Sequence, residues 1–330
     1  MDHLPKRILL ATDGSECAET AGRVAVDLAN SSRAELDVVH AFEFVSPREF
    51  AGVALRLHSP SECVKQGRGV LDEQVERVEE MGGAVADARL LTGSPVNQIL
   101  CAAEEADAGL VVVGRRGLGG VKRLLMGSVS EGVIHRARCP VLVVCGEGDI
   151  WPPARVVIAD DCSEDARRAG ELAAGIGGLF GAEGVLVQVY PRVLKSTQGM
   201  SALESRIVDH ALREAESELA ARAEELAPLL VQRPDVKLVV DEADRGVDGV
   251  AVTLLKEAEG AWALISVGSR GLGAVQRARV GSVSTKVVRA ARGPGPGLPP
   301  RPRRDGGGKR GLTKRGRPRR IAPCSDATQN

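Results

Sequence analysis

Aromatic residues are scarce in this chain, and it contains no long hydrophobic run. Phe, Trp and Tyr make up 2% of its 330 residues, too few to build an extended base-stacking surface. No apolar run approaches the roughly 18 residues of a membrane-spanning helix, and the first residues lack the apolar stretch of a signal peptide. The remaining composition, 43% apolar and 27% charged, is typical of a soluble protein of about two domains. We therefore expect a cytoplasmic protein with no membrane association.

The chain also lacks the common patterns for disulfides, metal sites and nucleophilic catalysis. Its seven cysteines are odd in number and never spaced as C-x-x-C, and its five histidines form no metal-spaced pair. No G-x-S-x-G elbow is present either. Reduced, mostly buried thiols are the expected state of the cysteines, and the pattern disfavours a hydrolase or a metalloenzyme with its own metal ligands.

The formal net charge of zero conceals a basic C-terminal tail. Residues 294–330 contain ten Lys or Arg against two Asp, and fourteen of them are Gly or Pro. Such a composition predicts a disordered segment. A polycation could bind nucleic acid in a salt-sensitive, non-specific way, but the tail has no aromatic residue to stack on bases. Non-specific nucleic-acid binding through the tail is therefore a secondary hypothesis.

The body of the chain is a duplication. Gly114–Ser130 reads GRRGLGGVKRLLMGSVS and Gly268–Ser284 reads GSRGLGAVQRARVGSVS, identical at eleven of seventeen positions. Each copy also alternates short apolar runs with amphipathic segments, the pattern of a doubly wound α/β sheet of parallel strands. The strands expected in copy one are Arg7–Ala11, Leu36–Phe42, Val85–Leu91, Leu110–Val113 and Val141–Val144. Those expected in copy two are Arg155–Val157, Leu186–Tyr190, Val236–Val240 and Leu264–Val267.

Four helices are expected between the strands of copy one. Three lie at Ala18–Ala29, Val70–Val78 and Pro95–Ala106, and the fourth starts at Ser128, where Glu131 three residues on completes a capping box. Copy one closes with an apolar fifth strand, but the matching stretch of copy two is rich in Gly and Pro and cannot pair in a sheet. We predict a domain at 1–147, a linker at 148–154, a four-stranded domain at 155–293 and the tail at 294–330. The abrupt end of the homology is also consistent with a reading-frame shift.

The motif G-x2-G-x9-G-S follows a strand and precedes a helix in both copies. Ligands of open α/β sheets bind at this edge, where glycines let backbone N–H groups approach a phosphate and a helix N-terminus favours an anion. The Ser hydroxyls at 128, 130, 282 and 284 could add donors to such a cradle. Tight turns and close helix packing are the alternative role for these glycines. Neither a Walker A loop nor a G-x-G-x-x-G fingerprint is present.

An acidic residue follows the first strand of each copy. Asp13 stands in Ala11-Thr12-Asp13-Gly14-Ser15, and alignment of Ser15 with Ser163 matches it to Asp161. A carboxylate there could hydrogen-bond a ribose or a purine. Capping of the following helix is an equally good account of Asp13. Copy two has a further acid, Asp160, which we expect to bring a second negative charge towards the ligand.

Together these motifs resemble the universal stress protein family. The resemblance rests on T-D-G-S after strand one, V-H-A-F, G-S-P at 93–95, and V-V-G-x-x-G-x9-G-S-V-S followed by C-P-V-L-V-V. It covers residues 1–145 and, less completely, 155–293, where Arg245-Gly246-Val247 replaces G-S-P. It implies two Rossmann-like, adenine nucleotide alpha hydrolase-like domains, with strand order 3-2-1-4-5 in copy one. The glycine motif is characteristic of the family's ATP-binding branch.

The resemblance also implies ATP as the ligand, with Mg²⁺ bound through its phosphates. In copy one, adenine and ribose would meet Ala11, Thr12, Asp13, Ala41 and Val113, and the phosphates would meet Gly114, Gly117, Gly127, Ser128, Val129 and Ser130. The matching set in copy two is Asp160, Asp161, Val189, Val267, Gly268, Gly271, Gly281, Ser282, Val283 and Ser284. Arg115, Arg116 and Arg270 could pair with phosphate.

The function expected from these observations is that of an ATP-binding, nucleotide-dependent module of the stress response. Pairing of the two domains within the chain, or a homodimer, is the expected assembly. Two alternatives stay open: a weak ATPase or adenylyl-transferring enzyme, and a nucleotide-free dimerisation scaffold. No paired base and nucleophile stands near the loops, since His40 lies in a strand and is matched by Gln188 in copy two.

Overall fold

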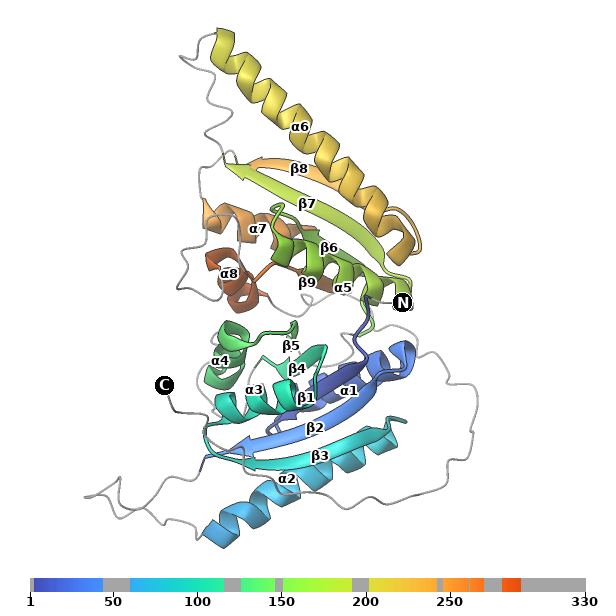
Figure 1. The fold of residues 1–330 in the computed structure, drawn as a ribbon, viewed down its shortest axis with the longest axis vertical. Helices are drawn as coiled ribbons and strands as arrows, with labels where there is room; N and C mark the ends of the chain where they lie inside the picture. The colour runs from blue at the N-terminus through green and yellow to red at the C-terminus, as the bar shows by residue number, and fades with distance from the viewer. Residues whose placement is uncertain are drawn as a thin grey trace, which may run out of the picture. The chain divides into compact units, whose positions relative to one another are not determined.

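The computed structural model describes residues 3–43, 60–115, 126–145, 151–191, 202–241, 246–260, 262–269 and 281–291. The chain divides into two compact units, one around each copy of the repeat (Figure 1), and each is described by itself. Four predicted site residues, Arg116, Gly117, Arg270 and Gly271, lie outside the described residues. So do the whole predicted tail, residues 294–330, and residues 44–59, which precede the second helix.

The unit of copy one contains a parallel sheet of five strands in the order β3-β2-β1-β4-β5. The register pairs Ala11 of β1 with Val39 of β2 and Val113 of β4, so these strands end beside one another. The predicted fold class and strand order are therefore confirmed for copy one. The strands are β1 (Arg7–Thr12), β2 (Glu35–Phe42), β3 (Val85–Thr92), β4 (Leu110–Gly114) and β5 (Val141–Val144).

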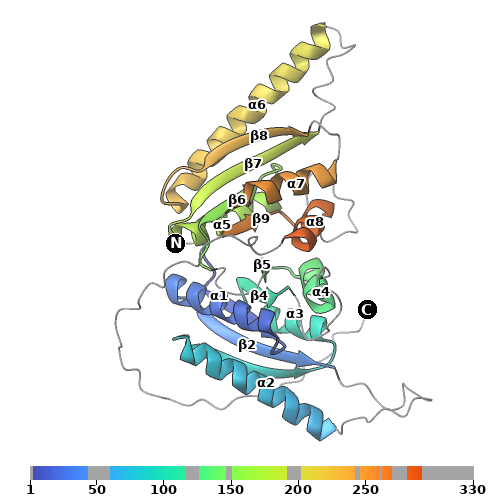
Figure 2. The same ribbon diagram turned by 180° about the vertical axis from the view of Figure 1, so that it is seen from behind.

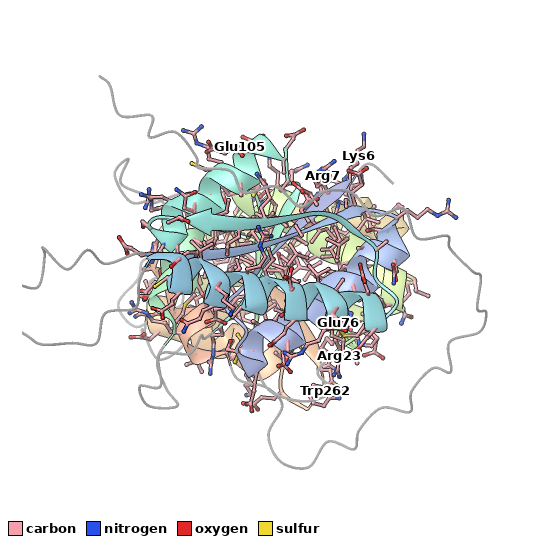
Figure 3. The ribbon with its side chains drawn as sticks, turned by 90° about the horizontal axis from the view of Figure 1, so that it is seen from below. Lys6, Arg7, Arg23, Glu76, Glu105 and Trp262 are labelled. Carbon is pink, nitrogen blue, oxygen red and sulfur yellow. The ribbon has the colours of Figure 1, made fainter. Side chains whose placement is uncertain are left out.

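Helices cover both faces of this sheet. They are α1 (Glu16–Ser32), α2 (Pro60–Glu80), α3 (Pro95–Glu105) and α4 (Ser128–Arg136). Figure 2 shows α1 and α2, and Figure 3, seen from below, shows α2 on one face of the sheet and α3 on the other. α1 buries Ala18, Ala21, Ala25 and Leu28, a stripe with helical spacing that faces the strands. On the other face, Ile99 of α3 and Val133 of α4 pack in one core cluster with Val113.

The unit of copy two repeats this plan with four strands in the order β8-β7-β6-β9. α5 and α6 contribute Ala173 and Leu219 to one core cluster, and α7 and α8 contribute Leu254 and Val287 to another. The strands are β6 (Arg155–Ala159), β7 (Glu183–Pro191), β8 (Asp235–Asp241) and β9 (Ala263–Ser266). The helices are α5 (Glu164–Phe180), α6 (Ala202–Leu226), α7 (Val247–Glu257) and α8 (Ser282–Ala290), with a short 3₁₀ turn at Ala227–Leu229.

The predicted difference in strand number is confirmed. β4 is covered by β5 on one side and β1 on the other, and its residues Leu110–Val113 are at most 3% exposed. β9 pairs only with β6 among the described residues, and Ala263, Leu264 and Ile265 are only partly buried. β9 ends at Ser266, so Val267 lies just beyond the strand rather than in it. No helix in the described ranges is long and apolar enough to cross a membrane.

Candidate functional site

The described residues predicted to bind a ligand in copy one gather at the carboxyl end of the sheet. Ala11 and Thr12 end β1, Val113 and Gly114 end β4, and Asp13 is the next residue after β1. Gly127 precedes α4, whose first residues are Ser128, Val129 and Ser130. Ala41 lies near the end of β2. Because the carboxyl ends of parallel strands share one edge, these elements form one candidate site.

The N-terminus of α4 carries no side-chain cap. Gly127 is its N-cap residue, with φ −67° and ψ 140°, and glycine has no side chain with which to cap the first turn. The predicted capping box is therefore wrong, since Ser128 is the first helical residue and not the cap. By contrast, Ser15 caps α1 by accepting a hydrogen bond from the N–H of Ala18 at 3.3 Å. The first-turn amides of α4 are thus available to an external anion.

α8 in copy two begins in the same way. Gly281 is its N-cap residue, with φ −70°, and again no side chain caps the first turn. As in copy one, a serine caps the first helix of the copy: Ser163 precedes α5, and its side chain accepts a hydrogen bond from the N–H of Ala166 at 3.2 Å. In both copies, therefore, a serine side chain caps the N-terminus of the first helix, whereas a glycine without a side chain stands at the N-cap of the helix after the glycine motif.

Two of the predicted hydroxyl donors are used inside the protein. Ser130 is buried and its Oγ donates to the carbonyl oxygen of Gly114 at 2.7 Å. Ser284 makes the matching bond to Gly268. These hydroxyls hold the first turn of the helix against the end of the strand, so they are not phosphate donors. The expectation stands for Ser128 and Ser282, which are exposed at the first helical position.

Close packing accounts for the first glycine of each motif. A Cβ at Gly114 would lie 2.8 Å from the backbone carbonyl carbon and oxygen of Cys17. At Gly268 it would lie 2.8 Å from the backbone nitrogen of Ala166. Backbone of the first helix therefore approaches the strand end so closely that only glycine fits. Packing therefore explains why these two positions are glycine, and a contact of any of the motif glycines with phosphate stays a prediction.

The loop after β1 is held by neutral hydrogen bonds. The hydroxyl of Thr12 donates to Oε1 of Gln74 at 2.9 Å and accepts from the N–H of Gly14 at 3.2 Å. Nδ1 of His40 lies 2.8 Å from the carbonyl oxygen of Thr12. Asp13 accepts from the N–H of Ser15 at 3.1 Å, so Ser15 and not Asp13 is the helix cap. The site edge is thus fixed by contacts between β1, β2 and α2.

The corresponding loop of copy two is held by an ion pair. Asp160, which replaces Thr12, lies 3.7 Å from Nε of Arg222, and the side chains are 9% and 7% exposed. Asp160 also accepts from the N–H of Cys162 at 2.7 Å. Arg222 contacts Glu171 at 3.1 Å and Glu225 at 2.7 Å as well. The expected second negative charge towards a ligand is therefore wrong, because this charge is compensated by the arginine of α6.

Cys162 occupies the position of Gly14 in copy two. Its φ is 64°, in the left-handed region that Gly14 adopts with φ 77°. Its sulfur accepts a hydrogen bond from Nε2 of Gln188 at 3.4 Å. Desolvation and the negative charges of Asp160 and Glu218 raise the pKa of the Cys162 thiol. The thiol therefore stays neutral in this acidic surrounding.

The sequence reasoning missed the residues that support these loops. Gln74 and Arg222 occupy matching places in the two copies, because they are 148 positions apart in the sequence, as are Thr12 and Asp160. Both lie on the buried face of a helix, where a polar residue interrupts an apolar stripe such as Leu71, Val75 and Val78. That interruption was the available signal. It could have been read together with the change from Thr12 to Asp160.

No ready-made metal site accompanies the loops. The described residues contain no group of three or more His, Cys, Asp or Glu side chains that could hold a metal ion.

Comparison with known proteins finds the same family in both copies. The model of the universal stress protein family matches residues 5–144 and 154–294. The chain belongs to the universal stress protein family. A universal stress protein of Mycobacterium tuberculosis is 30% identical over 239 residues, which are 69% of this chain and 75% of that protein. One from Thermus aquaticus is 40% identical over 139 residues, 42% of this chain and 98% of that protein.

Solved structures of the family show the same fold. A universal stress protein from Archaeoglobus fulgidus covers 86% of this chain and 93% of its own, with a TM-score of 0.54 and 24% identity. It supports the tandem arrangement of two α/β units. A universal stress protein in complex with cAMP is 27% identical and covers 42% of this chain and 97% of its own, with a TM-score of 0.34.

Proposed function

We propose that this universal stress protein binds ATP at the carboxyl edge of copy one and acts as a nucleotide-dependent module of the stress response. The observation that carries the proposal is the uncapped N-terminus of α4 at Gly127, next to the end of β4. Helix N-termini with unpaired amides are favourable sites for phosphate. Membership of the family supports a nucleotide as the ligand class, and the glycine-capped start of α4 supports this location.

The surrounding residues fit a nucleoside with a phosphate chain. The amides of Ser128, Val129 and Ser130 would bind phosphate oxygens, and Mg²⁺ would be bound through those oxygens. Val113 and Ala41 offer apolar surface beside Val129 in one cluster, suited to a base. Asp13 at the end of β1 would accept a hydrogen bond from the ribose.

The decisive experiment is the nucleotide content of gently purified protein, released by denaturation and quantified. Gly127→Val should abolish ATP binding at copy one, because it places a branched side chain at the N-cap position, next to the first-turn amides of α4. The backbone at 127, with φ −67°, accepts a side chain without strain, so the variant should fold. Gly281→Val makes the matching change in copy two, at φ −70°.

An exposed glycine of α2 provides the control. Gly69 lies in α2 and a Cβ there would meet nothing within 4 Å, so Gly69→Val should leave nucleotide binding unchanged. If wild-type protein carries no nucleotide and shows no ATP binding by titration, the proposal is wrong and the scaffold hypothesis takes its place. Release of ADP from bound ATP during the same titration would instead favour the weak ATPase.

The assembly stays a prediction of the same kind. Pairing of the two domains and a homodimer both follow from the family resemblance, and light scattering of the full chain with and without ATP separates a monomer from a dimer. Domain limits of 1–147 and 155–293 are likewise proposed, on the alternation of elements in each copy.

A further inference from the structure

The side-chain amide of Gln98 is buried in copy one with an oxygen that has no partner. Gln98 is the fourth residue of α3 and is 8% exposed. Its Oε1 makes no hydrogen bond in the described part of the chain. Polar atoms buried in this way nearly always have a hydrogen-bond partner, so an unpaired one calls for a structural or a functional reason. Oε1 is an acceptor, and the group that would satisfy it is therefore a donor.

This amide lies at the carboxyl edge of the sheet. Gly93 follows the last residue of β3, and a Cβ there would lie 3.0 Å from Nε2 of Gln98 and 3.6 Å from its Cδ. The N–H of Gly93 donates to the carbonyl oxygen of Phe42, the last residue of β2, at 2.9 Å. The amide therefore lies where β2 and β3 end. Ala41, the residue proposed to contact the base, is the neighbour of Phe42 in β2.

The other groups of the candidate site lie on the same face of the sheet as α3. Ala41 packs in the core cluster that contains Ile99 of α3, and so does Val129 in the first turn of α4. α3 and α4 lie side by side (Figure 1), and a Cβ at Gly132 of α4 would be 2.7 Å from Cγ2 of Val96 in α3. A nucleotide with its base beside Ala41 and its phosphates at the start of α4 would therefore lie beside the start of α3.

The fold itself does not require an amide at this position. α3 and α7 both have eleven residues and take the same place in their units, so Gln98 corresponds to Val250, the fourth residue of α7. Val250 packs against a core cluster of copy two. A valine therefore fills the matching place in the same architecture. The amide of copy one, with its oxygen left unpaired, is a difference that packing does not explain.

We propose that Gln98 selects the base of the nucleotide bound at copy one, with Oε1 accepting a hydrogen bond from the exocyclic amino group of adenine. The proposal rests on the nucleotide-binding function proposed above and adds the residue that distinguishes one base from another. The terminal torsion of a glutamine has a broad well, so a moderate turn of the amide presents Oε1 to the base while α3 stays in place. An amide suits adenine because it offers the amino group an acceptor and a ring nitrogen a donor.

The same contact disfavours bases with an oxo group at that position. Guanine and hypoxanthine carry a carbonyl oxygen where adenine carries the amino group, so Oε1 would face a second acceptor. A site built to accept a hydrogen bond rejects a ligand that lacks the donor, because its own buried acceptor is left unpaired.

The test is calorimetric titration of the full-length Gly281→Val protein, in which the second cradle is blocked, with ATP and with inosine triphosphate. The two ligands share the ribose and the phosphates, and inosine has an oxo group in place of the amino group of adenine. We expect ATP to bind at least tenfold more tightly, which corresponds to about 1.4 kcal/mol. Gln98→Val, which installs the residue of copy two, should bring the two affinities within about threefold of each other and leave that for inosine triphosphate nearly unchanged.

Two further variants separate base selection from packing. Gln98→Met keeps the length of the side chain, removes the acceptor and should lower the preference as Gln98→Val does. Asn97→Val makes the same substitution at the neighbouring residue, which is exposed on α3, and should keep the preference of the parent protein. Thermal unfolding by circular dichroism accompanies each titration. Gln98→Val should fold, because valine occupies the matching position of α7.

The outcomes separate this proposal from the general one. If wild-type and Gly281→Val protein bind neither ligand, the proposed nucleotide function itself fails. If ATP binds no more tightly than inosine triphosphate, or if both Gln98 variants keep the preference, the assignment of Gln98 is overturned while the function of copy one stands. An equal loss of both ligands in these variants, or loss of their fold, would show a packing role and overturn the assignment in the same way.

Discussion

The two copies make the same contact between the first strand and the second helix with different chemistry. In copy one the contact is a neutral hydrogen bond from Thr12 to Gln74, and in copy two it is an ion pair of Asp160 with Arg222. Thr12, Gln74 and Arg222 are buried, and the side chain of Asp160 is 9% exposed. Removing one partner of a buried neutral hydrogen bond costs about 1–3 kcal/mol, whereas leaving a buried charge alone costs about 3–5 kcal/mol. Copy two therefore gained a strong dependence on one arginine.

The residues at the carboxyl edge of the sheet also differ between the two copies. Copy one keeps small or neutral residues at Gly14 and Cys17, where copy two has Cys162 and Asp165. The uncapped helix that follows the glycine motif is common to both. The two copies therefore share the glycine-capped start of this helix and differ in the side chains at these two positions.

The largest effect is expected from removal of Arg222. Arg222→Gln leaves the Asp160 carboxylate buried without a counter-ion and should destabilise copy two by about 3–5 kcal/mol. Trp151 and Trp262, the two tryptophans of the chain, belong to the unit of copy two, so their fluorescence during urea unfolding reports on it alone. The double variant Asp160→Thr/Arg222→Gln recreates the neutral pair and should recover most of the loss. Equal instability of the single and double variants would contradict the ion-pair account.

The next effect is expected at the first glycine of each motif. Gly114→Ala and Gly268→Ala place a Cβ 2.8 Å from backbone atoms of the first helix, and each should cost about 1–3 kcal/mol. Thermal unfolding by circular dichroism measures both. Gly69→Ala, in open space on α2, is the control and should stabilise by up to about 1 kcal/mol. A large cost in one copy only would show that the two strand ends pack differently.

A smaller effect separates the two serines that begin α4. Ser130→Ala removes the donor to the carbonyl of Gly114 and should cost about 1 kcal/mol of stability. Ser128→Ala should leave the stability nearly unchanged and instead weaken ATP binding a few-fold. Chemical denaturation and titration of both variants test the assignment. Ser284→Ala should repeat the stability loss in copy two.

The smallest effect concerns the reactivity of Cys162. Its pKa is raised by burial and by neighbouring acids, and thiolate is the reactive form. Alkylation of Cys162 by iodoacetamide, followed by peptide mass spectrometry from pH 6 to 10, should rise through a midpoint above that of a free cysteine. Asp161→Asn removes one of these negative charges and should move the midpoint down slightly. A midpoint at or below the free value would remove the acidic environment that we infer at copy two.

Much of the fold was accessible from the pattern of apolar runs. The nine expected strands all exist, with ends shifted by a few residues, as for β7, which begins at Glu183 rather than Leu186. α2 is longer than its apolar stripe indicated, since it begins at Pro60. Strand ends and helix starts depend on individual hydrogen bonds, which periodicity does not encode.

The site was only partly accessible. The glycine motifs correctly located the strand ends and helix starts, but not which glycines and serines are used by the protein itself. Ser128 and Ser130 are indistinguishable as sequence letters; one lies at the first position of α4 and the other turns inward onto Gly114. The pairing of Asp160 with Arg222 joins residues far apart in the chain and appears only once α6 packs on β6.

The sequence by itself determined the duplication, the α/β alternation and the smaller sheet of copy two, because these follow from repeats, apolar periodicity and the absence of a strand-forming segment. Only the tertiary structure decided which polar groups are already satisfied. Hydrogen bonds and ion pairs depend on distances of a few ångströms between distant segments, and packing sets those distances. The open end of α4 and the closed pair of Asp160 with Arg222 are two results of that packing.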